Sequence, residues 1–292
     1  MKFVVFKNNE TDANYRCGAL VSGTEIVDLT VLAADGELSP LGLLRCFDLD
    51  NDFLANARRE LAKHELPRIA KADVRLCAPV PRPEKIICVG LNYRDHARES
   101  KMAVPESPVI FSKFANCIAG PNEPIFLPRT SAKVDYEAEM AVVVGRRAKH
   151  VRAADAMDYV FGYTNFNDVS ARDFQFADGQ WVRGKSCDTF APIGEYIATA
   201  DELADPHKLR IRFRLNGATL QDSNTDQLIF RIPELIEFLS ASMTLVPGDI
   251  IATGTPPGVG FARTPPVFMK DGDVAEVEIE GLGILSNPVI NG

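Results

Sequence analysis

The chain has 292 residues, of which 46% are hydrophobic and 25% are charged, and its formal net charge is -8. This length allows one long domain or two of unequal size, and the acidic balance argues against a nucleic-acid partner, which needs a basic face. The first residues are apolar too briefly for a secretory signal, and no apolar run approaches the roughly 20 residues of a membrane span. We therefore predict a soluble cytoplasmic protein with no membrane or nucleic-acid partner, whose local charge still allows small anionic substrates.

The N-terminal quarter has the pattern of a small separate unit. Short strand patterns occupy residues 2–7, 17–21, 25–29 and 74–77, with helical patterns at 41–47 and 52–64. Prolines at alternate positions follow, at 79, 81 and 83, and they favour an extended connector. We place a domain boundary there, between a small N-terminal domain at 1–77 and a second domain at 78–292.

The second domain opens with a buried strand pattern that ends near Gly90, followed by a pair of residues with acid–base character. His96 and Glu99 stand three apart and share a face if this turn is helical. A carboxylate beside an imidazole orients the ring and raises its basicity, which suits a general base, although such a pair is more often a surface contact. Residues 101–106 have no periodicity and are a candidate mobile lid.

An acidic strand follows at residues 134–145. With a period of two, Asp135, Glu137 and Glu139 lie on one face, and the strand then continues into an Ala-Val-Val-Val run typical of a buried core strand. Three carboxylates on one face repel one another, so a positive group is expected opposite. Two interpretations remain open: an exposed acidic face neutralised by Lys and Arg, or a divalent metal held by Glu137 and Glu139.

Four later segments carry polar or turn-forming residues. Residues 163–175 are dense in polar side chains and also carry aromatics, which suggests a partly buried polar site, and Lys185 lies between small residues near the only Trp. Asn216-Gly217 between two strand patterns predicts a hairpin. The Thr/Gly/Pro-rich run at 253–260 follows a buried strand, and it is either a plain turn or a source of hydroxyl and N–H donors for a carboxylate.

These segments together resemble the fumarylacetoacetate hydrolase family over roughly residues 80–290. Five motifs occur in the family's order: Gly90-x-Asn92-Tyr93-x-x-His96, Asp135-x-Glu137-x-Glu139, Asn167-Asp168-x-Ser170-Ala171-Arg172-Asp173, Gly184-Lys185-Ser186 and Thr253-Gly254-Thr255-Pro256-x-Gly258-Val259-Gly260. The runs at 108–114 and 265–270 are most similar to one branch of this family. The resemblance implies an α+β, mainly β protein, with a rolled mixed-sheet catalytic domain, a small N-terminal domain and a homodimeric assembly.

The resemblance also implies a set of site residues. The family's metal ligands correspond to Glu137, Glu139 and Asp168, and a ligand set made of carboxylate oxygens suits Mg²⁺, with Mn²⁺ or Ca²⁺ as alternatives. The remaining positions are Arg172, Gln175 and Thr255 for substrate binding, Lys185 for stabilising charge, and His96 with Glu99 for activating water.

The implied reaction begins with a 2-oxo or 1,3-dioxo acid that chelates the metal, so that the cation and Lys185 stabilise an enolate. The main prediction is a hydrolase that cleaves a C–C bond of an acylpyruvate or fumarylpyruvate. The alternatives are keto/enol tautomerisation or decarboxylation of oxaloacetate, which use the same enolate. A more remote alternative is a non-catalytic, metal-stabilised dimeric scaffold, which the presence of Lys185, Arg172 and the His96–Glu99 pair disfavours.

Overall fold

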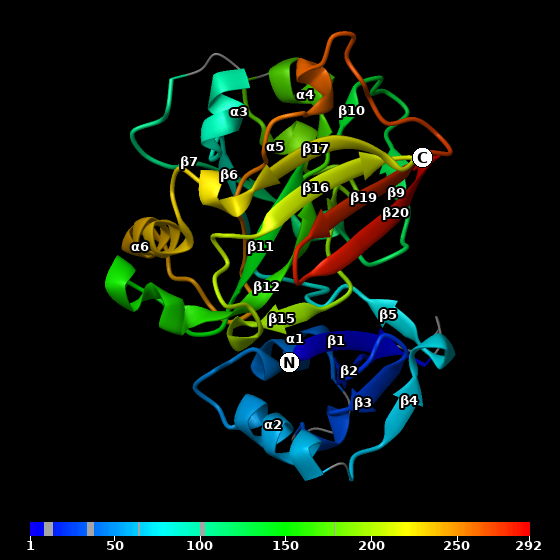
Figure 1. Cartoon of the computed structure of the whole chain (residues 1–292), viewed down its shortest axis with the longest axis vertical. Helices are drawn as coiled ribbons and strands as arrows, with labels where there is room; N and C mark the ends of the chain where they lie inside the picture. Colours follow the sequence, from blue (N-terminus) through cyan, green and yellow to red (C-terminus); the bar gives the residue numbers. More distant parts are fainter. Residues whose placement is uncertain (9–13, 34–37, 64, 100–102, 178) are drawn as a thin grey trace.

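The computed structural model describes the whole chain except residues 9–13, 34–37, 64, 100–102 and 178. Most of its regular structure is β-sheet (Figure 1), which confirms the predicted α+β, mainly β class. The strands are β1 Lys2–Lys7, β2 Arg16–Leu20, β3 Glu25–Asp28, β4 Arg68–Ala70, β5 Arg75–Cys77, β6 Ile86–Gly90, β7 Val109–Lys113, β8 Ile118–Ala119, β9 Ile125–Leu127, β10 Val134–Asp135, β11 Ala138–Val144, β12 Val160–Asn167, β13 Ser170–Ala171, β14 Ala191–Pro192, β15 Ile197–Thr199, β16 Arg210–Leu215, β17 Ala218–Asn224, β18 Ile250–Ala252, β19 Val274–Ile279 and β20 Gly283–Asn291.

The helices are short and lie around the sheets. The α-helices are α1 Pro40–Cys46, α2 Phe53–Lys63, α3 Arg94–Glu99, α4 Arg172–Ala177, α5 Val182–Lys185 and α6 Ile232–Ser242. The 3-10 helices are η1 Thr30–Leu32, η2 Lys71–Asp73, η3 Ala115–Cys117, η4 Ala153–Tyr159, η5 Ala200–Glu202, η6 Thr225–Gln227 and η7 Gly260–Ala262. No helix within the described residues is long and apolar enough to cross a membrane.

The largest sheet runs through the whole molecule in the order β4-β3-β2-β1-β15-β12-β11-β18-β6-β7, with β5 also paired to β1. Its central strands β15, β12, β11 and β18 are buried at every position, as expected for a sheet whose two faces are both covered. In β11, Met140 and Val142 point into one core cluster, and Ala141 and Val143 point into the other. This explains why the sequence there reads as a continuous apolar run.

A second sheet, in the order β17-β16-β19-β20-β9, covers one face of the first and shares a core with it. The stacked rings of Tyr136 and Phe213, whose centroids are 4.0 Å apart, join the segment before β11 to β16. The hairpin between β16 and β17 turns at Asn216 and Gly217, as predicted, and both residues have positive φ, at 52° and 79°. A turn of this kind matches the right-handed twist of the strands that it joins.

The first 77 residues are joined to the rest of the chain by strand pairing. Lys2 and Phe3 of β1 pair with Ala198 and Ile197 of β15, so the large sheet continues from the N-terminal strands into the later ones. One core cluster likewise contains residues from both sides of the proline-rich connector, Phe3 and Ile197 among them. The division at residue 77 stays a prediction.

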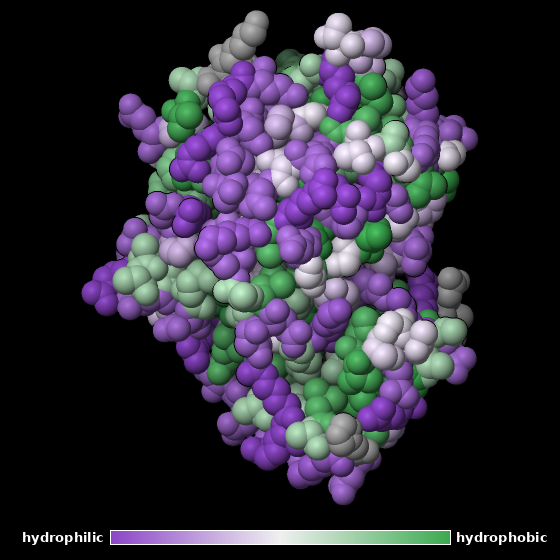
Figure 2. All heavy atoms as spheres, in the orientation of Figure 1, coloured by the Kyte–Doolittle hydropathy of each residue, from purple (hydrophilic) through white to green (hydrophobic). Residues whose placement is uncertain are grey.

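The surface seen in Figure 2 is mainly hydrophilic, and hydrophobic residues are exposed there in separate small areas. Some exposed apolar side chains lie on or next to β7, which ends the order of the large sheet: Val109 is 40% exposed and Phe114 is 59% exposed.

Candidate active site

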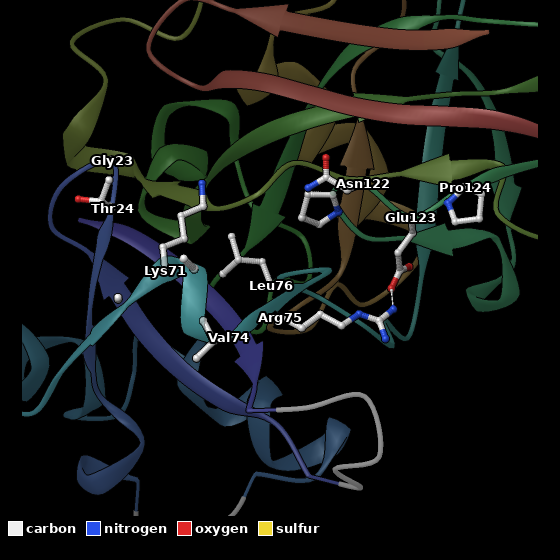
Figure 3. Close-up of a pocket in the computed structure, with 12 residues that line it drawn as sticks. Gly23, Thr24, Lys71, Val74, Arg75, Leu76, Asn122, Glu123 and Pro124 are labelled. Carbon is white, nitrogen blue, oxygen red and sulfur yellow. Dashed lines mark hydrogen bonds and ion pairs between the residues drawn. The ribbon is translucent and has the colours of Figure 1, made fainter. Parts of the chain in front are cut away.

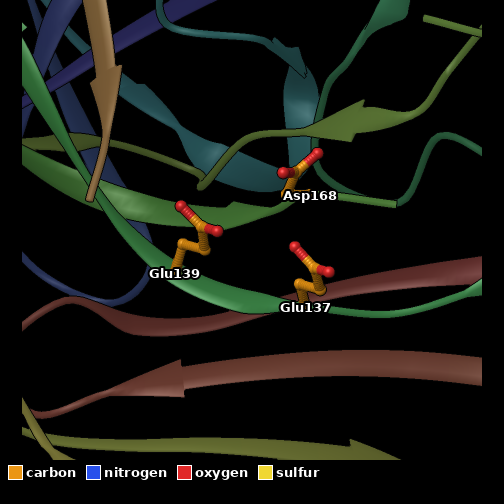
Figure 4. Close-up of side chains that lie close together, drawn as sticks. All are labelled: Glu137, Glu139 and Asp168. Atoms are coloured by element: carbon orange, nitrogen blue, oxygen red, sulfur yellow. The ribbon is translucent and has the colours of Figure 1, made fainter. Parts of the chain in front are cut away.

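Three buried carboxylates form the centre of the site. Oxygen atoms of Glu137, Glu139 and Asp168 all lie within 4.8 Å of one another, and Figure 4 shows the three side chains pointing toward a common space. Glu139 is 1% exposed and Asp168 is 0% exposed, so the interpretation as a solvated acidic strand face is wrong. The structure brings together the three predicted metal ligands.

Strand register is what joins residues so far apart in sequence. β11 and β12 are antiparallel, with Ala138 opposite Asn167 and Glu139 opposite Phe166. Glu137 and Asp168 therefore meet just beyond the paired ends, where the N–H of Asp168 donates to the carbonyl oxygen of Glu137 at 2.9 Å.

The strand predicted at 134–145 is divided into β10 and β11, because Tyr136 and Glu137 leave the ladder. Asp135 belongs to a different group from the three clustered carboxylates, although it was expected on the same strand face. Its oxygens accept from Arg172 Nε at 2.9 Å and from the N–H of Gly260 at 2.7 Å. Asp135 therefore ties α4 to the turn that begins η7.

Two buried ammonium groups contact the carboxylates. Lys185 Nζ lies 2.8 Å from Glu137 Oε2 and 2.7 Å from Asp168 Oδ2. Lys113 Nζ lies 2.6 Å from Asp168 Oδ1 and donates to the carbonyl oxygen of Val169 at 3.0 Å. The positive charge that the acidic strand requires is therefore supplied in part by lysines.

The neighbouring charges separate the acidities of two of these carboxyl groups. Burial opposes ionisation of Glu137, but Lys185 and Arg172 outweigh it and lower the pKa of Glu137 to about 2. Burial, followed by repulsion from Asp168 and Glu137, raises the pKa of Glu139 well above its ordinary value. Burial acts against the charged form of Lys185, yet Asp168 and Glu137 raise its pKa, so it remains an ammonium.

A divalent cation fits this arrangement. The only hydrogen bond that the Glu139 carboxylate accepts within the described residues comes from the N–H of Gly254, at 2.8 Å, and no described cation pairs with it. A buried carboxylate without a cation, beside two others, is unfavourable, and a hard divalent ion coordinated by oxygen removes that repulsion. Glu137, Glu139 and Asp168 would hold the ion, which would supply positive charge for the oxygens of a 2-oxo acid.

Arg172 and Gln175 adjoin the carboxylates on α4. Arg172 Nη2 lies 2.6 Å from Glu137 Oε1, and Arg172 Nη1 donates to Gln175 Oε1 at 2.9 Å. The Arg172 guanidinium also lies over the ring of Phe261 at 4.4 Å. Of these two predicted substrate-binding residues, Arg172 contacts Glu137 directly, and Gln175 is linked to Glu137 through Arg172.

His96 and Glu99 form the predicted pair on α3. His96 Nδ1 lies 3.1 Å from Glu99 Oε2, and both Glu99 oxygens accept from the N–H of Gly258, at 3.0 and 3.1 Å. The Glu99 contact places α3 against the loop at 253–260, which also supplies Gly254 to Glu139. Residues 101 and 102 of the candidate lid lie outside the described residues.

Thr255 lies in the same loop, but its hydroxyl is engaged within the protein. It donates to the carbonyl oxygen of Ala138 at 2.9 Å and accepts from Gln221 Nε2 at 2.8 Å. The predicted contact of Thr255 with a substrate carboxylate would require the hydroxyl to change its donor partner. The structure shows Thr255 supporting the start of β11 beside Glu137 and Glu139.

Sequence reasoning missed Lys113, whose side chain is completely buried. A lysine in a short strand pattern is normally assigned to solvent. The available signal was that Lys113 alternates with Phe111 on one strand face, and the ring of Phe111 lies 4.8 Å from Lys185 Nζ. The sequence alone does not show that Phe111 lies beside Lys185, so the burial of Lys113 could not be predicted from this alternation.

A cavity of about 750 Å³ lies away from the carboxylates. Figure 3 shows its lining, which comes from the N-terminal unit and from the loop that precedes β9. Its charged side chains are already paired, Lys71 with Glu195 and Arg75 with Glu123. Ligand pockets of this size carry converging polar groups, and the predicted site residues all lie elsewhere, so we assign no function to this cavity.

Comparison with known proteins adds three findings. The family model described as fumarylacetoacetate (FAA) hydrolase C-terminal matches residues 85–290. A Rattus norvegicus protein named oxaloacetate tautomerase Fahd2a, mitochondrial, is 49% identical over 92% of this chain and 85% of its own. Two solved structures are similar over the full length of both chains. Maleylpyruvate hydrolase from Sphingobium sp. SYK-6, in complex with manganese(II) and pyruvate, is 35% identical, with a TM-score of 0.83. The 5-carboxymethyl-2-hydroxymuconate delta-isomerase from Mycobacterium smegmatis is 36% identical, with a TM-score of 0.77.

The predicted cytoplasmic location is contradicted by these relatives. The similar proteins of rat, cattle, Xenopus laevis and human are named as mitochondrial. The prediction relied on the lack of a secretory signal and of a membrane span. Neither criterion concerns mitochondrial targeting, which uses amphipathic, Arg-rich segments instead of an apolar core.

Proposed function

Because this chain belongs to the fumarylacetoacetate hydrolase family, we propose that it is a divalent-metal-dependent oxaloacetate tautomerase. The observation that carries the proposal is the buried group of Glu137, Glu139 and Asp168 with the Lys185 ammonium against two of its members. The 49% identity to a relative named as an oxaloacetate tautomerase favours this reaction over the hydrolysis that the motifs first suggested.

Tautomerisation breaks a C3–H bond and forms an O–H bond on the C2 oxygen, while the double bond moves from C2=O to C2=C3. His96 is the proposed base: Nδ1 faces Glu99, which leaves Nε2 to take the proton from C3. The C2 oxygen gains negative charge as the C3 proton leaves. Lys185 is the proposed hydrogen-bond donor that stabilises this charge. The oxygen then takes up a proton from solvent and His96 releases to solvent the proton that it took from C3, so the enol is complete and the enzyme returns to its starting protonation state.

The surroundings of each group suit its role. Lys185 is buried and remains protonated beside Asp168 and Glu137, so its positive charge is little screened by water. Glu99 is held by Gly258 and therefore fixes the orientation of the His96 ring. Arg172 is the proposed contact for a substrate carboxylate, together with Gln175.

Hydrolysis of a C–C bond is the second candidate. The same His96–Glu99 pair can remove a proton from water aimed at the distal carbonyl of an acylpyruvate or fumarylpyruvate. The observation that favours it is the similarity over the full length of the chain to a maleylpyruvate hydrolase. Decarboxylation of oxaloacetate would use the same enolate and is the third outcome to be measured.

One substrate panel separates these reactions. The purified protein with Mg²⁺ is offered enol-oxaloacetate, acetylpyruvate and fumarylpyruvate, and both enol absorbance and total product acids are followed. A tautomerase changes the enol absorbance and keeps total oxaloacetate constant. Release of pyruvate and a second acid from a β-dioxo acid, without accelerated oxaloacetate equilibration, would replace this proposal with the hydrolase, whereas CO₂ release would identify the decarboxylase.

Two further parts of the proposal concern the ion and the assembly. We propose Mg²⁺ as the resident ion, with Mn²⁺ as the first alternative because the similar maleylpyruvate hydrolase structure contains manganese(II).

We also propose a homodimer, supported by the exposed Val109 and Phe114 at the end strand of the large sheet. Activity after exchange of the metal, and sedimentation at several protein concentrations, test the two parts separately.

A further inference from the structure

Helix α3 is fastened to the rest of the protein by carboxylates on either side of His96. Asp95 uses both of its oxygens: Oδ1 accepts from the N–H of His96 at 3.0 Å, and Oδ2 accepts from the hydroxyl of Ser223 on β17. Glu99 accepts from the N–H of Gly258 in the loop at 253–260. We infer that the hydrogen bond between Asp95 and Ser223 positions His96 for catalysis, an inference that rests on the proposed function.

Helix α3 needs such a contact because it is short and mostly polar. It has six residues, and only His96 and Ala97 among them are buried. A single helical turn is unstable by itself, and most helices gain their stability from an apolar face that packs against a core. Within α3 the burial of Ala97 is too small for that role, so side-chain hydrogen bonds must fix its orientation.

The start of α3 is anchored separately. The N–H of Ile229 donates to the carbonyl oxygen of Asn92 at 2.8 Å, and Arg94 Nη1 donates to the carbonyl oxygen of Leu228 at 2.6 Å. These contacts set where the helix begins. They leave the rotation of the following turn to the two carboxylates, because within the described residues no other side-chain hydrogen bond joins α3 to β17 or to the loop at 253–260.

Ser223 is a suitable fixed point. It lies on β17, where it pairs with Ile211 of β16, so its position is set by a ladder in the second sheet. The acceptor is a carboxylate, and hydrogen bonds to charged groups are roughly twice as strong as neutral ones. The contact also joins the face of the second sheet to the helix that carries the proposed base, across 128 residues of sequence.

The first test removes and then restores the Ser223 hydroxyl. Ser223→Ala is expected to lower kcat for enol-oxaloacetate by about 10- to 100-fold, with little change in KM or in Mg²⁺ affinity, because a displaced base affects the proton transfer and not substrate binding. Ser223→Thr retains a hydroxyl and is expected to recover most of the rate. Thr219→Ala is the control, since Thr219 is exposed on the same strand.

A second measurement does not depend on activity. Amide hydrogen exchange in the substrate-free protein reports the opening of α3, and exchange at residues 95–99 is expected to be faster in Ser223→Ala than in Thr219→Ala. If Ser223→Ala does not fold, Asp95→Asn replaces it, with the same expected pattern and a smaller effect because the neutral amide is a weaker acceptor.

The outcomes separate this inference from the proposed function. If the wild type turns over none of the panel substrates, the proposed function fails, and faster exchange of α3 in Ser223→Ala still supports the positioning of α3 by the Asp95–Ser223 hydrogen bond. If Ser223→Ala matches Thr219→Ala in both kcat and exchange, this inference is overturned. A rise in KM alone would also overturn it, because that result would place Ser223 in substrate binding.

Discussion

The two halves of the site are built in different ways. Glu137, Glu139 and Asp168 lie at or just beyond the paired ends of β11 and β12, two central strands of the large sheet, and all three are buried. His96 and Glu99 lie on a helix of six residues at the end of the molecule away from the N-terminal strands (Figure 1), and polar contacts attach that helix. The carboxylate half is therefore fixed by the fold, whereas the base half depends on a few individual hydrogen bonds.

This difference has a functional consequence. Carboxylates that bind an ion must be kept close together against their own repulsion, which requires a rigid and buried frame. The helix that carries the proposed base is held by polar contacts with Ser223 and Gly258, and only His96 and Ala97 within it are buried. Substitutions in the two halves should then fail differently: the first should affect ion binding and stability, and the second should affect turnover.

The largest expected effect comes from removing a carboxylate. Glu137→Ala is expected to abolish Mg²⁺ stabilisation and to reduce turnover by about 10³-fold or more, because the ion's contribution of several kcal/mol is lost. It also leaves Lys185 and Arg172 without one of their buried partners. The measurements are the thermal shift with Mg²⁺ and the rate of enol-oxaloacetate equilibration.

A chelator provides the matching experiment without any substitution. The wild type in excess chelator should lose activity and recover it when Mg²⁺ is added back. Full activity in the chelator would contradict the proposal that Glu137, Glu139 and Asp168 hold an ion that activity requires.

Removing the base is expected to have the next largest effect. His96→Ala should lower turnover by about 10²- to 10⁴-fold, the usual range for loss of a general base, while Mg²⁺ binding stays close to that of the wild type. The unequal effect is expected because the described hydrogen bonds of His96 are with Asp95 and Glu99, and His96 is not one of the three carboxylates that would hold the ion. A His96→Ala protein that has also lost its thermal response to Mg²⁺ would show that the two halves are one unit.

The carboxylate half is the part of the site that the sequence predicted best. The spacing Glu137-x-Glu139 before an apolar run favoured grouped oxygen ligands but also left an exposed acidic face open, and Asp168 entered the set only through the resemblance to the family. The family motifs predicted the same set, and the family, the branch of fumarylacetoacetate hydrolase domain-containing protein 2 and the prediction of an enzyme are confirmed by the comparisons.

The features that the sequence did not reveal depend on long-range packing. Lys113 reaches Asp168 only because β7 and the end of β12 are brought together by the fold, and a lysine at an edge strand has no local sign of burial. The pairing of β1 with β15 joins segments about two-thirds of the chain apart, so a proline-rich connector alone cannot indicate how the two units are joined. The separation of Asp135 from Glu137 likewise arises from a break in the strand that Arg172 and Gly260 stabilise.

A smaller effect than that of the base is expected at Lys185. Lys185→Met should reduce turnover by about 10²- to 10³-fold, since it removes a positioned donor for the developing oxygen charge, and it should leave Mg²⁺ affinity equal to or above that of the wild type. The affinity does not fall because the lysine occupies oxygens of Glu137 and Asp168 that the ion also needs. Lys270→Met, at an exposed position, is the control. Weaker Mg²⁺ binding in Lys185→Met would contradict the assigned role.

The smallest effect expected is a pH dependence of stability that the ion removes. Burial, with Asp168 and Glu137, raises the pKa of Glu139 in the folded protein, so without metal the folded state binds a proton that the unfolded state releases. The stability of the metal-free protein should therefore fall as the pH rises above the ordinary Glu value of about 4.5 toward the raised pKa. Glu137 has the opposite sign, but its pKa of about 2 places its contribution below that range.

Mg²⁺ is expected to change this slope because it would bind the ionised carboxylate of Glu139. Its apparent affinity should increase with pH by up to about tenfold per unit while one proton is displaced, and its stabilising effect should be largest where the metal-free protein is weakest. Thermal unfolding with and without Mg²⁺ across this range measures both slopes. Glu139→Gln keeps the shape of the side chain and removes its titration, so its metal-free slope should be flatter than that of the wild type. Equal slopes in the two proteins would show that Glu139 is not the group that links the proton to the ion.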